Sequence, residues 1–376
     1  MHLYVHIPFC VRRCSYCDFS IAVRQRIPAR EYVDAVLAEL RLLGSADSGP
    51  LETLYFGGGT PSLFTPASIE RFFNLVARLC PLAPNLEVTL EADPATVTLE
   101  KLVGYHSVGV NRLSYGTQSF QPALLKTLGR LHSVEDSFRA IAWARESGFT
   151  NLSLDLIFAV PGQTLAMLAS DLSQALSFTP EHLSVYNLTY EENTPFFVMK
   201  QKGQLRPLDE DEEVAMYALI QEQCAAQGYQ HYEISNFARP GFSSRHNTRY
   251  WKGDSYLGLG AGAHSFAREP VWGMRWSNER NPKTYMNKAL ANGSARSFVE
   301  TLTRTQALGE FVFLHLRQLD GFAPATFAER FGIGLTEAFP HVTDLLAEGL
   351  LTEEADRIKL TSQGLLIADT VFASFF

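Results

Sequence analysis

Three of the five cysteines of the chain lie within eight positions near its start, as Cys10, Cys14 and Cys17 in the stretch "FCVRRCSYCDF". Their spacing is C-x3-C-x2-C, on a loop that follows a short apolar strand. Thiolates are the side chains that soft metals and iron–sulfur clusters prefer as ligands. The loop is polar, with two arginines between the first two cysteines, so it does not resemble a stretch of core. The three thiols therefore indicate a metal centre rather than a chance group of buried cysteines.

The number of thiols distinguishes two kinds of metal centre. A structural zinc ion closes its coordination with four ligands, but Cys80 and Cys224 lie far away in helical patterns. A cubane cluster of four irons would be held at three irons by these cysteines, leaving the fourth iron open. An open coordination position is typical of a reactive centre. We therefore expect a 4Fe–4S cluster, and a zinc site with His6 as fourth ligand is the alternative.

Further polar residues stand at or just beyond the ends of predicted strands. The glycines of "GGGTP", residues 57–61, allow backbone groups to approach a ligand closely, although a tight turn alone also explains them. The carboxylates of Glu91 and Asp155 can accept hydrogen bonds from hydroxyl or ammonium groups, and the guanidinium of Arg130 can pair with a carboxylate. Helix caps or buried ion pairs are the alternative for each residue. Asp155, inside "LSLDLIF", requires a partner because a buried lone acid is costly.

Short apolar strands alternate with amphipathic helices up to about residue 190. This alternation predicts right-handed βαβ units and a parallel sheet of six strands, either a partial barrel or a doubly wound sheet. The strands are almost wholly apolar, as in sheets covered on both faces. In a βα barrel, the carboxyl ends of the strands carry the chemistry. The predicted strands are residues 3–7, 52–58, 86–93, 112–118, 151–160 and 182–190.

The rest of the chain has a different pattern. A helix is predicted over residues 211–227, and residues 228–266 are rich in glycine, aromatic residues and histidine without a long periodic segment. Residues 344–369 read as helix, β-hairpin and helix, similar to a winged helix, but this region is acidic and therefore unsuited to DNA. We expect three parts: a barrel over 1–200, an extension over 201–297 and a winged-helix-like domain over 298–376.

Composition limits the function classes. The 376 residues have a formal net charge of −8, which argues against nucleic-acid binding. No apolar run reaches the roughly 18 residues of a membrane span, and the N-terminus does not resemble a signal peptide. Five cysteines are too few for a secreted disulfide scaffold. We expect a cytoplasmic protein without a membrane span, for which peripheral membrane contact stays open.

The cysteine motif, with Tyr16 before the last cysteine, resembles the radical S-adenosylmethionine superfamily, and the resemblance covers roughly residues 1–265. It implies a partial (β/α)6 barrel and a cluster whose open iron is chelated by the methionine end of S-adenosylmethionine. In the oxygen-independent coproporphyrinogen oxidase branch, residues at matching positions contact this cofactor. The resemblance thus implies a cofactor site made of Tyr4, Gly58, Gly59, Thr60, Glu91, Gln118, Arg130 and Asp155.

Two features separate the chain from the oxidases themselves. The oxidases carry another cysteine two residues after the third, where this chain has Phe19, and they have a longer segment before the cluster motif. Instead, "RHNTRYW", residues 245–251, fits H-N-x-x-Y-W, the signature of the HemW family of haem chaperones. This resemblance implies a protein that binds haem and passes it to an acceptor protein, with no catalytic residue of its own. A radical coproporphyrinogen oxidase is the alternative.

The H-N-x-x-Y-W stretch also suits haem chemically. A neutral imidazole is a common axial ligand of haem iron, aromatic rings stack on a flat macrocycle, and the two arginines of the stretch can pair with propionates. Alternatively, the stretch forms a capped turn whose aromatic residues anchor it in the core. The implied haem-binding residues are His246, Asn247, Tyr250 and Trp251, with His231, Tyr232 and His264 as rival ligands. The glycine-rich "LGLGAGAHSF", residues 257–266, is expected near the adenine of S-adenosylmethionine.

Overall fold

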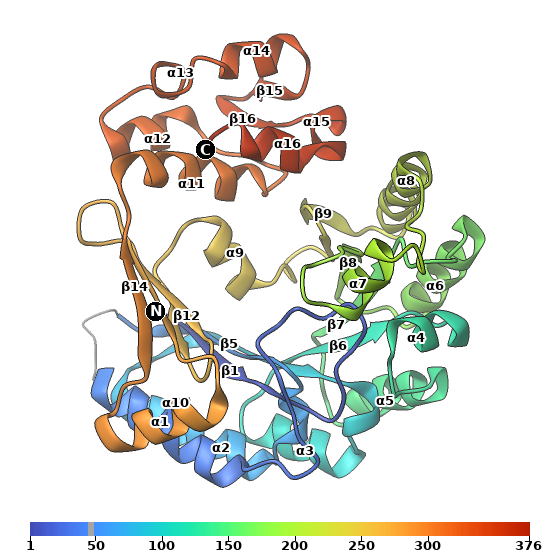
Figure 1. The fold of residues 1–376 in the computed structure, drawn as a ribbon, viewed down its shortest axis with the longest axis vertical. Coiled ribbons are helices and arrows are strands. Elements are labelled where there is room, and N and C mark those ends of the chain that lie inside the picture. Colours follow the sequence, from blue (N-terminus) through green and yellow to red (C-terminus); the bar gives the residue numbers. More distant parts are fainter. Residues whose placement is uncertain (44–48) are drawn as a thin grey trace.

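The computed structural model describes residues 1–43 and 49–376, and its centre is a curved nine-stranded sheet (Figure 1). Six strands run parallel and adjacent in chain order, with every neighbouring pair in parallel register. They are β1 (His2–Ile7), β4 (Leu51–Gly58), β5 (Leu82–Ala92), β6 (Arg112–Gln118), β7 (Leu152–Phe158) and β8 (His182–Asn187). The predicted partial (β/α)6 barrel is therefore confirmed.

Three short strands extend this sheet at its two edges, and helices cover its outer side. On one edge β11 (Leu257–Leu259) pairs parallel with β1, and on the other β10 (Asn236–Ala238) and β9 (Gln230–Glu233) continue antiparallel from β8. Figure 1 shows the helices along the outer, convex side. The helices between the parallel strands are α1 (Ala29–Leu43), α2 (Pro66–Leu79), α3 (Leu99–Ser107), α4 (Pro122–Leu128), α5 (Val134–Glu146) and α6 (Leu165–Ser177).

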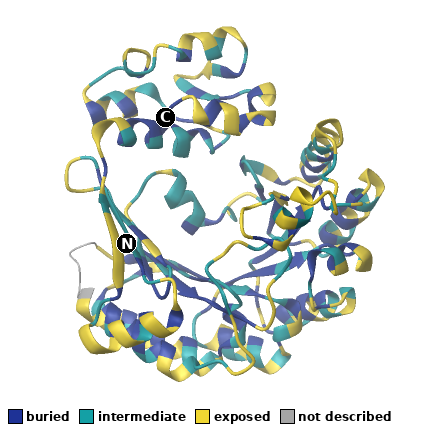
Figure 2. Cartoon of the chain, viewed as in Figure 1, coloured by how far each residue is buried: buried dark blue, intermediate teal, exposed yellow. Residues whose placement is uncertain are grey.

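Burial and helix caps explain why these residues form these elements. The parallel strands are almost entirely buried, because helices cover one face and the barrel interior the other (Figure 2). Several helices start with a side chain that accepts a free backbone N–H, as at Thr65, Thr98 and Thr164. Ser133 and Asp136 form a complete capping box at α5. These caps therefore fix the residues at which the helices beside the sheet begin.

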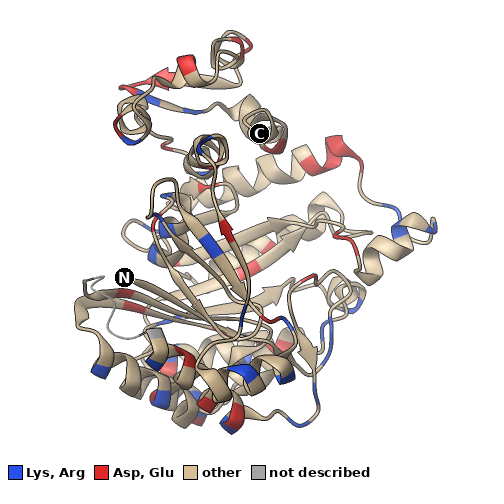
Figure 3. Ribbon diagram, turned by 60° about the vertical axis from the view of Figure 1, so that its left-hand side comes forward, with Lys and Arg blue, Asp and Glu red and all other residues tan. Residues whose placement is uncertain are grey.

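Residues 182 to 301 complete the wall next to the sheet. The predicted helix over 211–227 is α8 (Glu210–Ala226), whose first turn is a run of acids visible in Figure 3. The glycine-rich region, where no periodic segment was expected, contains short elements that tertiary packing holds in place. In order, the remaining elements here are α7 (Pro195–Gln201), α9 (Arg245–Trp251), β12 (His264–Ala267), β13 (Met274–Asn278), α10 (Pro282–Asn292) and β14 (Arg296–Thr301).

The C-terminal region is mainly helical and has its own hydrophobic core, built around Phe311, Phe327 and Phe372. It lies beyond α9 from the barrel (Figure 1). The elements of this region are α11 (Arg304–Leu316), α12 (Pro324–Phe331), α13 (Leu335–Ala338), α14 (Val342–Ala347), β15 (Leu351–Glu354), β16 (Arg357–Leu360), α15 (Ser362–Leu366) and α16 (Ala368–Ala373). Among them, α14, β15, β16 and α15 form the predicted helix–hairpin–helix. The boundaries drawn at residues 200 and 297 stay a prediction.

A membrane-spanning helix is not found in the described part of the chain. None of the helices over residues 1–43 and 49–376 combines the length and the apolar character that crossing a bilayer requires.

Candidate functional site

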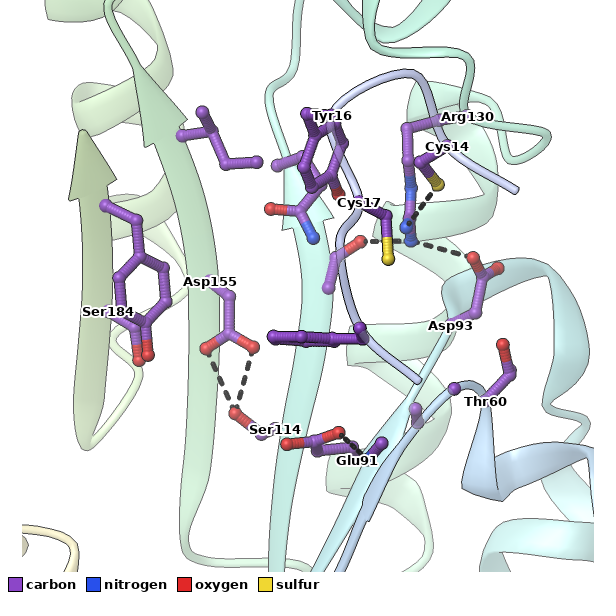
Figure 4. A pocket seen from close by; sticks show the side chains of 18 of the residues that line it. Cys14, Tyr16, Cys17, Thr60, Glu91, Asp93, Ser114, Arg130, Asp155 and Ser184 are labelled. Atoms are coloured by element: carbon purple, nitrogen blue, oxygen red, sulfur yellow. Dashed lines mark hydrogen bonds and ion pairs between the residues drawn. The ribbon is translucent and has the colours of Figure 1, made fainter. Parts of the chain in front are cut away.

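A cavity of about 780 Å³ opens inside the barrel, at the carboxyl ends of the parallel strands. The cysteine loop forms one of its walls, and side chains from β4 to β8 form its floor (Figure 4). Asn247 of α9 lines it on the far side, and Arg317 and Asp369 line it from the C-terminal region. The volume lies within the range of roughly 300–1,000 Å³ that ligand pockets commonly have.

All three cysteines of the loop line this cavity, whereas Cys80 and Cys224 are buried elsewhere. Two short strands, β2 (Phe9–Cys10) and β3 (Ala22–Val23), pair at the base of the loop. The carbonyl of Cys10 accepts the backbone N–H of Arg24 at 2.9 Å. The Nε of Arg13 donates to the carbonyl of Cys17 at 3.1 Å. The loop is therefore held in shape by its own backbone, with its thiols turned toward the cavity.

The placement of the thiols fits a cluster better than a single ion. No group of three His, Cys, Asp or Glu side chains in residues 1–43 and 49–376 gathers around one point as one metal ion requires. A cubane binds each thiolate through a different iron, so its ligands need not converge. His6, the fourth ligand in the zinc alternative, bonds through Nε2 to the carbonyl of Ser20 at 2.9 Å and through Nδ1 to Tyr4. The loop therefore suits a 4Fe–4S cluster.

Two of these thiols are protonated in the metal-free chain, because burial raises the pKa of Cys10 and raises that of Cys17 to about 11. Two donors from the neighbouring elements point at thiols of the loop. The hydroxyl of Thr60 reaches the sulfur of Cys10 at 3.5 Å, and Nη1 of Arg130 reaches that of Cys14 at 3.5 Å. Such donors stabilise thiolates once iron replaces the protons.

The glycine turn after β4 lies directly against the cysteine loop. A Cβ on Gly59 would come within 2.8 Å of the carbonyl of Phe9 and 3.0 Å of the sulfur of Cys10. Gly58 has φ +114°, and a Cβ there would strike the ring of His6 at 2.6 Å. Because no other residue fits at these two positions without a shift, the glycines are required for this packing. Both glycines and Thr60 line the cavity.

Glu91 lies at the end of β5 and faces the cavity from beside the glycine turn. Its carboxylate accepts the hydroxyl of Tyr55 at 2.8 Å and the N–H of Gly58 at 3.0 Å. Burial raises the pKa of Glu91 to about 7, although the Tyr55 hydrogen bond acts in the opposite direction. The carboxyl is thus poised to change its charge near neutral pH.

Arg130 is already paired within the chain. Its Nη2 donates to Asp93 at 2.7 Å and to the carbonyl of Gly116 at 2.8 Å, and all three residues line the cavity. Burial alone would raise the pKa of Asp93, but His132 and Arg130 bring it below its usual value. Asp93 was not predicted as a site residue, although it stands two residues after Glu91 in "LEADP". The ion pair fixes the guanidinium beside the cysteine loop.

Gln118 ends β6 with φ 66°, an uncommon left-handed conformation for a residue other than glycine. The register of β6 against β7 shifts just before it. Asp171 holds the following turn, accepting the Ser119 hydroxyl at 2.6 Å and the Phe120 N–H at 2.9 Å. Gln118 lines the cavity. Such strain persists only where surrounding contacts enforce it, and it is common at functional sites.

Asp155 projects from β7 into the cavity and has the partners that its buried position requires. Ser114 donates to both carboxylate oxygens at 3.0 and 3.1 Å, and Ser153 donates at 3.2 Å. Burial raises the pKa of Asp155, and hydrogen bonds from Ser184, Ser114 and Ser153 oppose that rise. Hydrogen bonds from serines of three neighbouring strands therefore stabilise this buried acid.

Tyr4 is the one predicted cofactor residue that does not line the cavity. Its hydroxyl bonds to Nδ1 of His6 at 3.0 Å, and its ring stacks on Tyr55 with centroids 6.0 Å apart. Tyr55 occupies the cavity wall in front of it. Tyr4 therefore supports the wall from behind, and the other seven of the eight predicted residues face the cavity.

The H-N-x-x-Y-W stretch forms α9, and of its four named residues only Asn247 lines the cavity. His246 is 1% exposed, with Nδ1 bonded to Thr53 at 2.7 Å and Nε2 to Tyr250 at 2.8 Å. Burial lowers the pKa of His246 to about 3. Trp251 stacks under the guanidinium of Arg317, whose Cζ lies 4.5 Å from the ring centre. The stretch thus ties the barrel to the C-terminal region, and its haem role stays a prediction.

The glycine-rich segment 257–266 packs against the chain and does not line the cavity. A Cβ on Gly260 would meet the carbonyl of His6 at 2.4 Å, and its N–H donates to the buried Glu39 at 3.0 Å. A Cβ on Gly262 would strike Ser20, at the end of the cysteine loop. This segment therefore supports the loop from outside, and its expected position near the adenine of S-adenosylmethionine stays a prediction.

Several polar residues of the cavity were missed from the sequence because they lie inside strands or far apart in the chain. Alternation along the strands places one residue in two toward the barrel interior, which was the signal that could have found those on strands; no such signal exists for Arg317, at the end of α11. These residues are Tyr55, Arg112, Ser114, Ser153, His182, Ser184, Tyr186 and Arg317.

Comparison with known proteins places this geometry in a family. The radical SAM superfamily matches residues 4–175, and the HemN C-terminal domain matches residues 302–367. The first match confirms the expected 4Fe–4S cluster and S-adenosylmethionine as cofactors. In structure the chain is similar to coproporphyrinogen III oxidase (HemN) from Escherichia coli, a radical SAM enzyme, with a TM-score of 0.84 and 26% identity, over 99% of this chain and 89% of the other.

The curated relatives share a different name. The chain is 37% identical to the heme chaperone HemW of Bacillus subtilis, over 99% of this chain and 98% of the relative. It is 34% identical to the heme chaperone HemW of Escherichia coli, over 100% of this chain and 98% of the relative. It is 40% identical to the heme chaperone HemW of a Synechocystis strain, over 75% of this chain and 69% of the relative.

Proposed function

The chain belongs to the HemW family of haem chaperones, and from this premise we propose that it binds haem and delivers it to an acceptor protein. The observation that carries the proposal is similarity at 37% identity over almost the whole length of a relative named as a heme chaperone. Similarity of that extent includes the barrel, α9 and the C-terminal region together. The acceptor protein is not identified by any feature of the chain.

The cysteine end of the cavity holds the metal cofactor in this proposal. Cys10, Cys14 and Cys17 bind three irons of the 4Fe–4S cluster, and the fourth iron is left for S-adenosylmethionine. When bound, the cluster supplies the electron that cleaves the sulfonium of this cofactor. The chain's own residues position the cofactor: the turn at Gly58–Thr60 offers backbone groups at close range, and Glu91 offers a carboxylate to hydroxyl or ammonium groups. Gln118, Arg130 and Asp155 line the same space.

Haem occupies the opposite end of the cavity in this proposal, between α9 and the C-terminal region. Asn247 contacts it directly. His246 and Tyr250 act by holding α9 in place, since both ring nitrogens of His246 already have partners. Ligation of iron by His246 would require at least one of these hydrogen bonds to break, at a cost of about 1 kcal/mol or more for a buried group left unpaired. Trp251 holds Arg317 at the boundary of the two regions.

The location of the protein is part of the proposal. The five cysteines carry no disulfide within residues 1–43 and 49–376, and thiol ligands of a cluster must stay reduced. We therefore place the protein in the cytoplasm, without nucleic acid as a partner. Peripheral contact with a membrane would come about through a membrane-associated acceptor protein rather than through an anchor on the chain itself.

A second function, radical coproporphyrinogen III oxidation, is supported by the structural similarity to the E. coli oxidase. Against it stands Phe19, which is 61% exposed at the cavity mouth where the resembling oxidases carry a further cysteine. The residue that differs thus lies beside the cluster itself. We infer a chaperone because the B. subtilis and E. coli relatives carry that name and match over almost their full length.

One anaerobic preparation with a reconstituted cluster separates the two functions. Haem is titrated and followed by its Soret absorbance, and coproporphyrinogen is offered with S-adenosylmethionine and a reductant. We expect saturable binding of about one haem per chain and no protoporphyrinogen. Formation of protoporphyrinogen at many turnovers per cluster, or the absence of a saturable Soret change, would overturn the proposal.

A further inference from the structure

Arg112 is a buried cation that faces the cavity without a close counter-ion. Its side chain is 2% exposed, at the start of β6, and lines the cavity floor. Nη1 donates to Oδ1 of Asn151 at 2.7 Å and to the carbonyl of Phe242 at 3.3 Å. Within residues 1–43 and 49–376, its Nε and Nη2 have no hydrogen-bond partner, and no carboxylate lies within 4 Å of it. Three of its five N–H donors are therefore available to a ligand.

The nearest acids are bound to other groups. Asp155 accepts hydroxyls from serines on the neighbouring strands. Glu87, 7% exposed, accepts the backbone N–H groups of Arg245 and His246 at the start of α9. A guanidinium removed from water without a paired anion costs several kcal/mol. This cost is recovered if a ligand brings the missing carboxylate.

The groups around Arg112 are otherwise neutral hydrogen-bonding side chains. His182, 1% exposed, bonds to Ser153 at 2.8 Å and to the hydroxyl of Tyr232 at 2.8 Å. Burial lowers the pKa of His182 well below its usual range, so this ring carries no charge at neutral pH. Ser244 and Asn247 line the same part of the cavity. The floor therefore combines one fixed positive charge with polar groups suited to a carboxylate.

A second guanidinium lines the cavity from the C-terminal region. Arg317 lies over the ring of Trp251, and its buried Nε has no hydrogen-bond partner among the described residues. No carboxylate of these residues lies within 4 Å of it either. By contrast, Arg130 at the cysteine end is paired with Asp93 at 2.7 Å. Arg12 of the cysteine loop also lines the cavity without an ion pair among the described residues, but it is exposed to solvent. Among the cavity-lining guanidiniums that are not exposed, the two without an ion pair therefore lie away from the cysteine loop.

We propose that Arg112 and Arg317 form a carboxylate subsite that binds the two propionates of haem, with Arg112 as the main anchor through its Nε and Nη2. Two parallel N–H donors match the two oxygens of a carboxylate. The inference rests on the proposed function, since it concerns the same ligand. It adds haem-binding residues outside the H-N-x-x-Y-W stretch. In this arrangement α9 forms a wall of the haem site, and the arginines anchor the propionates.

The test compares haem with haem dimethyl ester, in which both carboxylates are blocked, on the anaerobically reconstituted protein. Variants are Arg112→Gln, Arg112→Lys and Arg317→Gln, and Arg71→Gln, in a surface ion pair with Asp34, is the matched control. We expect the Kd for haem to rise about 10- to 100-fold in Arg112→Gln, the range for lost hydrogen bonds to a charged group. Arg112→Lys and Arg317→Gln should give a smaller rise, and Arg71→Gln none.

The ester keeps the inference testable even if a variant is damaged. Wild-type protein should bind haem at least tenfold more tightly than the ester, and the ester should bind wild type and Arg112→Gln alike. Equal affinity of the wild type for haem and ester would overturn the subsite but leave haem binding intact. A loss of S-adenosylmethionine affinity in Arg112→Gln, with haem affinity unchanged, would assign the guanidinium to that cofactor's carboxylate instead. Failure of wild type to bind haem at all would overturn the proposed function itself.

Discussion

The two ends of the cavity present their sequence motifs in opposite ways. At the cysteine end, a loop held by the pairing of β2 and β3 places all three thiols on the cavity. At the far end, the H-N-x-x-Y-W stretch forms a helix that turns His246 into the core and leaves only Asn247 on the cavity. The difference teaches that a motif on a loop can present all of its candidate ligands to the cavity. A motif on a packed helix instead contains side chains that hold the cavity wall in position.

The largest effect separates the loop thiols from the other two cysteines. Replacing Cys10, Cys14 or Cys17 by alanine should abolish cluster assembly, because the proposed function assigns one iron to each of them. Iron and sulfide content and the visible absorbance after anaerobic reconstitution measure this. Cys80→Ala and Cys224→Ala, buried away from the cavity, are the matched controls and should assemble the cluster. Loss of the cluster in Cys80→Ala would show that the ligand set is wrong.

The second prediction compares two neighbours on α9. His246→Ala removes two buried hydrogen bonds and leaves a cavity, so it should lower the free energy of unfolding by roughly 2–4 kcal/mol. Asn247→Ala, on the cavity side, should change it by less than about 1 kcal/mol but weaken haem binding. Thermal unfolding and Soret titrations of both variants provide the measurements. If His246→Ala kept its stability and lost its haem, the histidine would be a ligand rather than a support.

Much of the fold could be predicted from the sequence because its signals are local. Six apolar strands between capped amphipathic helices define the barrel, and spacing alone brings the three thiols together. The direction of a side chain in a compact region is different, since it depends on partners far along the chain. The imidazole of His246 hydrogen-bonds to Thr53, and the ring of Tyr4 stacks behind that of Tyr55, away from the cavity. Arg112 and Arg317 come from opposite ends of the fold, so nothing in the local sequence joins them.

The third prediction uses the charge of Glu91, beside the glycine turn at the cysteine end. Its pKa in the folded chain is about 7, above its ordinary 4.5, so the folded state holds this proton more tightly than the unfolded chain. Its contribution to stability is therefore present below pH 4.5 and is lost as the pH rises to about 7. The loss should be about 2 kcal/mol, because the carboxyl partly faces the cavity. Unfolding measured across this range should show the slope in wild type and not in Glu91→Gln.

Binding of S-adenosylmethionine gives an independent check of the same group. If the ionised carboxylate accepts hydrogen bonds from this cofactor, affinity should increase as the pH rises through about 7. The increase should vanish in Glu91→Gln. A wild-type affinity that is flat between pH 6 and pH 8 would contradict this role.

The smallest expected effect concerns the strained end of β6. Gln118 has φ 66°, a conformation that glycine adopts freely, so Gln118→Gly should raise stability by up to about 1 kcal/mol. The same variant should bind S-adenosylmethionine more weakly, because it lacks the side chain that faces the cavity. Gln118→Ala serves as the control that loses the side chain and keeps the strain. Lower stability in Gln118→Gly than in Gln118→Ala would show that the conformation is not strained.

The central claim at the cysteine end of the cavity is that three thiols leave one iron of the cluster open to S-adenosylmethionine. The electron paramagnetic resonance spectrum of the reduced, reconstituted centre tests it directly, recorded before and after this cofactor is added. A changed spectrum, saturating at one cofactor per chain, is the predicted result. A spectrum that stays identical at saturating cofactor would contradict the claim.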